Sequence, residues 1–85
     1  GNAAFASKDY QAAVRHYSMA ILLDDSNKVL FSNRSASHAA LGDFSEALSD
    51  AELAVNLAPD WPKAHSRKGA ALVGMGDFAR AVASY

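Results

Sequence analysis

The feature that most constrains this chain is an internal repeat of 34 residues. Three segments share one pattern, which is Asp, an aromatic residue, two variable residues, Ala and an aliphatic residue: DYQAAV at 9–14, DFSEAL at 43–48 and DFARAV at 77–82. The aromatic residues therefore recur at positions 10, 44 and 78, at a constant step of 34 residues. Unrelated segments have no reason to share a register, so the pattern predicts one structural unit that occurs three times.

Each unit has the sequence properties of two helices. In the first copy, the apolar residues fall at the spacing of one helix face: Tyr10, Ala13, Val14, Tyr17, Ala20 and Ile21. The Asp that opens each segment, such as Asp9, stands where its side chain can cap the first turn. Asp43 with Glu46 approximates a capping box. Gly42 and Gly76 can close the preceding helix in a left-handed conformation.

Two further helices are expected to open the second and third copies, at about 28–41 and 62–75, with Pro62 tolerated in a first turn. The APD segment at 58–60 marks the break between these copies. A single domain of residues 1–85 is thus expected, divided into repeats at 1–27, 28–61 and 62–85, of which the first and third are partial. Because the repeat frame begins inside one helix and stops inside another, flanking helices are expected in a longer protein.

Composition argues against several classes of function. The chain has 8 Lys plus Arg and 9 Asp plus Glu, so its net charge of −1 gives no general attraction to nucleic acid or to an anionic membrane. There is no cysteine for a disulfide or a thiolate metal site, and no apolar run approaches the roughly 18 residues of a membrane span. We expect a cytoplasmic location, with the nucleus as an additional one.

Neither a metal site nor an active site is indicated by the sequence. The histidines at 16, 38 and 65 lack the i, i+4 spacing of a helical metal site. No motif frames a nucleophile, and no glycine-rich loop follows a strand pattern. The prediction is therefore a protein that is not an enzyme and carries no cofactor.

A helix–turn–helix unit of 34 residues resembles the tetratricopeptide repeat (TPR). This resemblance implies an all-α solenoid of about two and a half repeats, which stack into a right-handed superhelix whose first helices line a concave groove. The residues expected on the inner face are Asn2, Phe5 and Ala6 in the first repeat, Asn33, Ala36, Ala39 and Ala40 in the second, and Lys63, Arg67, Ala70 and Gly74 in the third.

The inner face predicts a ligand that carries carboxylates. Lys63 and Arg67 lie one helical turn apart, and no acid occurs from Trp61 to Gly76 to neutralise them. Amides can add hydrogen bonds, and a shallow apolar floor can receive a small aliphatic side chain; these residues are Asn2, Asn33, Phe5, Ala36 and Ala39. The predicted ligand is an acidic chain end, held by its terminal carboxylate. The alternative interpretation is an ordinary solvated helix face.

Two neighbouring cations are expected to have other roles. Lys68 follows Arg67 directly and so points elsewhere, as a surface charge. Arg34 follows Asn33 in the same way and is expected to pair with an acid in a neighbouring helix.

Three segments resemble the carboxylate-clamp TPR domains, most closely the first such domain of the Hsp-organising protein (stress-inducible co-chaperone) family: GN at 1–2, SNRSA at 32–36 and DWPKAHSRK at 60–68. The family clamp has five positions, and four of them correspond to Asn2, Asn33, Lys63 and Arg67. The fifth, an early lysine, would precede Gly1. A further family position that is often basic corresponds to Ala40.

The resemblance implies a partner, namely the C-terminal Glu-Glu-Val-Asp tail of the cytosolic 70-kDa or 90-kDa heat-shock chaperones, with the 70-kDa type favoured. The clamp would hold the two carboxylates of the terminal aspartate, and the valine would contact Phe5, Ala36 and Ala39. Two alternatives stay open. One is a structural TPR module that mediates assembly without capturing a peptide end. The other is a different clamp co-chaperone, such as an immunophilin, phosphatase or small glutamine-rich family member.

Overall fold

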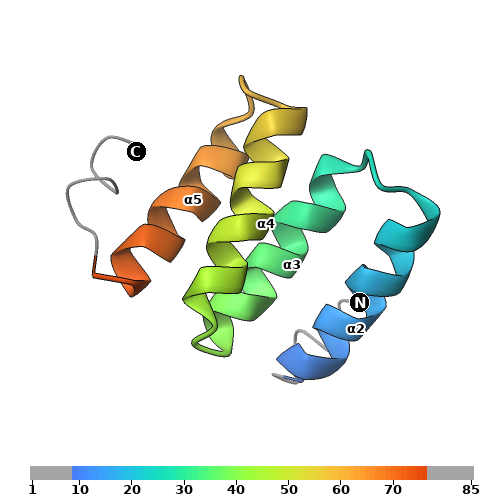
Figure 1. The fold of residues 1–85 in the computed structure, drawn as a ribbon, viewed down its shortest axis with the longest axis horizontal. Coiled ribbons are helices and arrows are strands. Elements are labelled where there is room, and N and C mark those ends of the chain that lie inside the picture. Colours follow the sequence, from blue (N-terminus) through green and yellow to red (C-terminus); the bar gives the residue numbers. More distant parts are fainter. Residues whose placement is uncertain (1–8, 77–85) are drawn as a thin grey trace.

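The computed structural model of the chain describes residues 9–76, which form four helices and no strand. The helices are α2 (Tyr10–Leu23), α3 (Lys28–Ala40), α4 (Phe44–Leu57) and α5 (Pro62–Gly74). Successive helices run in opposite directions and pack side by side, and α5 also contacts α3 (Figure 1). The all-α prediction is confirmed. α3 and α5 begin where the sequence predicted and end one residue earlier, at Ala40 and Gly74.

Glycines in a left-handed conformation close α3 and α5. Gly42 has φ +82°; its N–H donates to the carbonyl of Ala39 at 3.0 Å, and the next N–H, of Asp43, donates to the carbonyl of His38 at 2.8 Å. Gly76 repeats the geometry, with φ +82° and an N–H donated to Val73 at 2.9 Å. These bonds satisfy the last carbonyls of the two helices, as the sequence predicted.

The sequence predicted the N-terminal caps of the helices only in part. Asp9 caps α2 as predicted, because its carboxylate accepts a hydrogen bond from the Ala12 N–H at 3.1 Å. The capping box proposed for Asp43 and Glu46 is wrong: the Asp43 side chain makes no capping bond, and its N–H is already donated to His38. A cap that was not predicted is made by Asn27, which accepts from the Val29 N–H at 3.0 Å at the start of α3.

Small side chains let the helices approach closely. Among the residues that the structure describes, six alanines are completely buried, distributed over α2, α4 and α5: Ala13, Ala47, Ala51, Ala54, Ala64 and Ala71. At one close approach, the buried Ser35 hydroxyl of α3 donates to the carbonyl of Ala47 in α4 at 2.7 Å. Phe31 forms a buried cluster with Ala54 and Ala64, and the side chains of Ile21, Val55 and Trp61 pack against this cluster. The alanine-rich composition therefore reflects tight helix packing.

An aromatic wedge joins the second and third repeats. The Phe44 ring, from the first turn of α4, lies so close to Gly74 that a Cβ added to this glycine would overlap it. The aromatic residue at position 44 therefore packs between α4 and α5. Gly74 was expected on the inner face with Lys63 and Arg67, but the side-chain direction of this position points to the Phe44 ring of α4. Because α4 and α5 are antiparallel, the last turn of α5 packs against the first turn of α4.

Candidate functional site

The predicted inner-face residues that the structure describes lie on two helices, α3 and α5. α3 carries Asn33, Ala36 and Ala39, all of them half-buried. α5 carries Lys63, which is exposed, and Arg67, which is half-buried. Because α3 packs against α5, these two sets of side chains belong to adjacent helices. Asn2, Phe5 and Ala6 lie outside the described residues.

One direct contact connects the two helices at the candidate site. The Nε–H of Arg67 donates to the hydroxyl of Ser32 at 3.4 Å. Ser32 is completely buried and immediately precedes Asn33 in α3. The Arg67 side chain therefore extends from α5 to α3, where it contacts the residue that precedes Asn33.

The two cations of α5 are not neutralised by the part of the protein that the structure describes. Within residues 9–76, an ion pair joins Arg34 to Asp50, and His38 lies within 4.0 Å of both Asp43 and Asp50. Neither Lys63 nor Arg67 takes part in these contacts. Two uncompensated cations one turn apart attract an anionic group. Carboxylates suit this pair well, because a guanidinium can bind one through two parallel hydrogen bonds.

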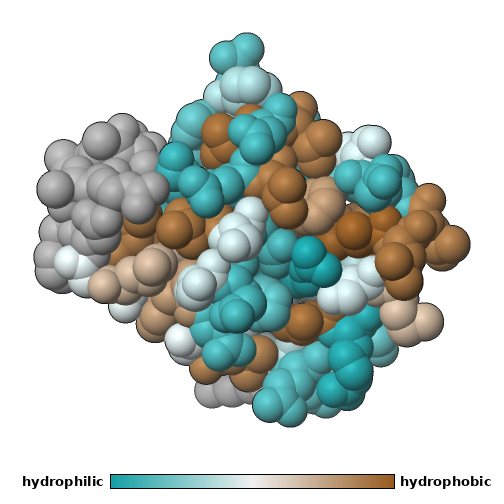
Figure 2. Space-filling view, in the orientation of Figure 1, coloured by the Kyte–Doolittle hydropathy of each residue, from teal (hydrophilic) through white to brown (hydrophobic). Residues whose placement is uncertain are grey.

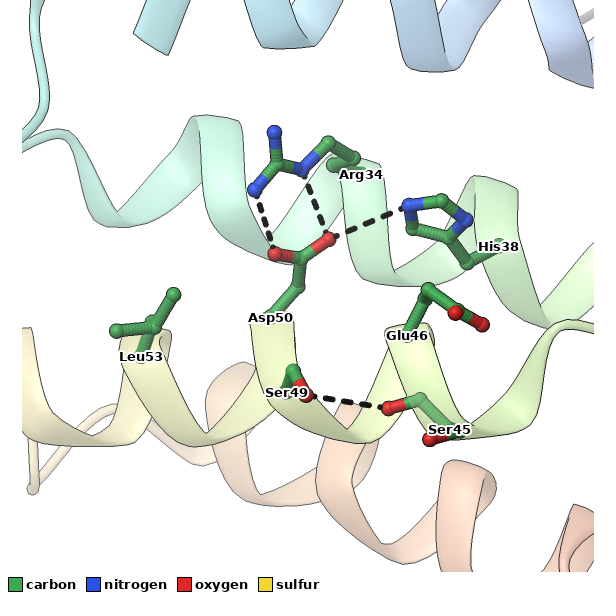
Figure 3. Close-up of a pocket in the computed structure, with 7 residues that line it drawn as sticks. All are labelled: Arg34, His38, Ser45, Glu46, Ser49, Asp50 and Leu53. Carbon is green, nitrogen blue, oxygen red and sulfur yellow. Dashed lines mark hydrogen bonds and ion pairs between the residues drawn. The ribbon is translucent and has the colours of Figure 1, made fainter.

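Arg34 has the structural role that the sequence predicted. Its Nε and Nη2 donate to the two carboxylate oxygens of Asp50 in α4, at 2.8 and 2.7 Å. Its Nη1 donates to the Ser18 hydroxyl of α2 at 3.0 Å. Arg34 thus connects three helices, and Figure 3 shows Asp50 held between Arg34 and His38. These bonds to α2 and α4 fix the rotation of α3 about its own axis.

Lys68 lies apart from Arg67, as expected. It lines a hollow of about 270 Å³ with three residues of α4, namely Glu52, Val55 and Asn56. The single-residue step from Arg67 to Lys68 therefore separates a cation that reaches α3 from one that lies against α4.

The sequence did not predict the surroundings of His38. Its Nε2 lies 3.7 Å from an Asp50 carboxylate oxygen, beside a hollow of about 310 Å³ that Glu46 and Leu53 also line (Figure 3). Only the position of His38, one turn after Arg34 in α3, could have indicated that it shares a partner with Arg34. Within residues 9–76, no group of three or more His, Cys, Asp or Glu side chains could hold a metal ion.

Comparison with known proteins identifies the class. No family model matches the chain. A solved Sgt2 TPR domain from Aspergillus fumigatus is 40% identical, with a TM-score of 0.97 over 100% of this chain and 56% of that one. The first TPR of Spaghetti (RPAP3), solved bound to the HSP90 peptide SRMEEVD, is 35% identical, with a TM-score of 0.96 over 100% of this chain and 68% of that one. The chain belongs to the tetratricopeptide repeat domains.

Within this class, the homologues are the TPR domain of the Sti1 and Hsp70–Hsp90 organizing proteins. The heat shock protein sti1 homolog of Schizosaccharomyces pombe is 51% identical over 85 residues, and the Hsp70–Hsp90 organizing protein of Triticum aestivum is 52% identical over 85 residues. These matches cover 100% of this chain but only 14% and 15% of the two relatives. Among the described helices, none has the length and apolar character needed to cross a membrane.

Proposed function

We propose that the chain is the adaptor domain of a co-chaperone and that it binds the C-terminal Glu-Glu-Val-Asp tail of cytosolic heat-shock chaperones. One observation carries the proposal: within residues 9–76, Lys63 and Arg67 have no acidic partner, while Arg67 donates a hydrogen bond to Ser32 of α3, the helix that carries Asn33. Two related domains support it. One was solved with the HSP90 peptide SRMEEVD, and the second TPR domain of human RPAP3, 28% identical to this chain, was solved with the HSP70 peptide SGPTIEEVD.

The tail has the chemistry that the candidate site can recognise. Its last residue presents two carboxylates, one from the side chain and one from the chain end. In the proposed complex, four residues hold these groups through charge-assisted and amide hydrogen bonds, namely Asn2, Asn33, Lys63 and Arg67. The preceding valine would contact the small apolar surface of Phe5, Ala36 and Ala39. The resemblance to the first domain of the organizing proteins favours the 70-kDa chaperone over the 90-kDa one.

The proposal also covers the organisation and location of the domain. The chain is one TPR domain whose repeats divide at residues 27 and 61; α3 and α5 begin directly after these positions, which supports the division. It acts by binding, without catalysis, in the cytoplasm. Homology to organizing proteins supports this adaptor role.

A second candidate function is assembly through an exposed apolar surface. Three side chains at the end of α2, Met19, Leu22 and Leu23, are 66%, 86% and 91% exposed. On the face drawn in Figure 2, apolar surface gathers at the right, over the end of α2. A patch of this kind can mediate self-association without any peptide end.

Calorimetric titration of the chain with two peptides, SRMEEVD and SGPTIEEVD, separates these functions. We expect both peptides to bind with a dissociation constant in the micromolar range, which corresponds to about 8 kcal/mol at 1 μM. Sedimentation in parallel is expected to give a monomer at every concentration. A chain that binds neither peptide and dimerises as its concentration rises would favour the assembly function instead.

A further inference from the structure

Within residues 9–76, Arg67 uses one edge of its guanidinium for a hydrogen bond and has no partner on the other edge. Its Nε–H donates to the Ser32 hydroxyl at 3.4 Å. Within residues 9–76, its two terminal nitrogens form no hydrogen bond or ion pair. A guanidinium has five N–H donors in a rigid planar fork, so fixing the Nε edge also fixes the direction of the other four.

Ser32 is well suited to hold that edge in place. It is completely buried in α3, so it cannot exchange its partner for bulk water. Within the described residues, Arg67 is the hydrogen-bond partner of its hydroxyl oxygen. A buried hydroxyl without a partner would be costly, which favours the state in which Arg67 stays in contact with α3.

Lys63, on the same helix, has no such anchor within residues 9–76. It is exposed and has no ion pair within residues 9–76. Its ammonium group is a mobile point charge on a flexible stem, and it loses side-chain freedom when it binds a ligand. Arg67, by contrast, is held before the ligand arrives, so less conformational freedom is lost on binding.

We propose that Ser32 is a positioning residue for the carboxylate clamp. It does not touch the peptide. It holds the Nε edge of Arg67 against α3, so that the two terminal nitrogens face the ligand carboxylate and can bind it through two parallel hydrogen bonds. This inference rests on the proposed function, because it assigns Ser32 a task in binding the same ligand.

The test is a set of calorimetric titrations with SRMEEVD on the full chain. We expect Ser32→Ala to weaken binding by about fivefold, since the loss of one hydrogen bond to a charged group is felt only indirectly by the ligand. The matched control is Ser35→Ala, which removes another buried hydroxyl of α3, one that donates to α4 and not to Arg67. This control is expected to bind the peptide as the unmodified chain does.

A double-mutant cycle separates positioning from a general structural role. Arg67→Lys keeps the positive charge but has no Nε–H at this place, so Ser32→Ala is expected to have no further effect on binding in the Arg67→Lys chain. A spectroscopic readout needs no peptide: the Arg67 Nε–H signal in the NMR spectrum is expected to exchange more slowly with water in the unmodified chain than in Ser32→Ala.

The outcomes distinguish the two proposals. If the unmodified chain binds SRMEEVD and Ser32→Ala binds it equally well, the role of Ser32 is overturned and the clamp stands. The same conclusion follows if Ser32→Ala weakens binding to the same extent in the unmodified chain and in the Arg67→Lys chain. If the unmodified chain does not bind the peptide at all, the proposed function fails, and the role of Ser32 fails with it.

Discussion

Replacing both Lys63 and Arg67 with alanine is expected to weaken the binding of a Glu-Glu-Val-Asp peptide by about 100-fold or more. Each residue supplies a cation that meets no acid of the protein within residues 9–76. Hydrogen bonds between charged groups are among the strongest that proteins form, and losing two of them leaves the peptide carboxylates without their main partners. Calorimetric titration measures the loss directly.

A second double variant controls for the change in net charge. Arg15→Ala with Lys68→Ala also removes two cations, one exposed on α2 and one that lies against α4 in a hollow with Glu52. We expect this variant to bind the peptide within about twofold of the unmodified chain, because neither cation belongs to the proposed clamp and charges far from the ligand are screened by salt. Equal losses in the two double variants would mean that net charge, and not a clamp, attracts the peptide.

Asp50→Ala is expected to lower the free energy of unfolding by about 3 kcal/mol. Asp50 is only 3% exposed, and both of its carboxylate oxygens accept hydrogen bonds from Arg34. Without Asp50, the mostly buried Arg34 keeps one hydrogen-bond partner within residues 9–76, the Ser18 hydroxyl, and no acid compensates the charge of the guanidinium there. A loss of this size is a large share of the stability of a small domain.

Urea denaturation followed by circular dichroism measures this effect. The matched control is Glu52→Ala, which removes an exposed acid from the same helix and forms no ion pair within residues 9–76. We expect the control to change the free energy of unfolding by no more than about 0.5 kcal/mol. If the two variants unfold at the same urea concentration, the Arg34–Asp50 pair does not hold the three helices together.

Much of the fold could be predicted because the repeat is local and periodic. The 34-residue step placed the helix starts, and Gly42 indicated the left-handed turn after α3, since both features depend on neighbouring residues. The different roles of Arg34 and Asn33 could also be anticipated, because adjacent helical residues point in different directions. The pairing of Arg34 with an acid of a neighbouring helix was anticipated on the same ground.

The features that the sequence predicted wrongly, or did not predict, have one physical cause. Periodicity indicates which residues share a helix face, but it does not specify which atoms of another helix meet that face. Gly74 packs against Phe44 because two antiparallel helices bring their opposite ends together, and the Asp43 N–H is donated to His38 because the preceding turn takes it. The contact between Arg67 and Ser32 likewise depends on how α5 lies against α3. The roles assigned to Asn33, Lys63 and Arg67 stay predictions.

The central claim is that the domain captures the free end of a peptide chain. The most direct measurement is a calorimetric comparison of SRMEEVD with the same peptide carrying a C-terminal amide, each titrated into the unmodified chain. The amide replaces the main-chain carboxylate of the last residue and leaves every side chain of the peptide unchanged. We predict that the amidated peptide binds at least about tenfold more weakly than the free acid. Equal affinity for the two peptides would contradict the carboxylate clamp.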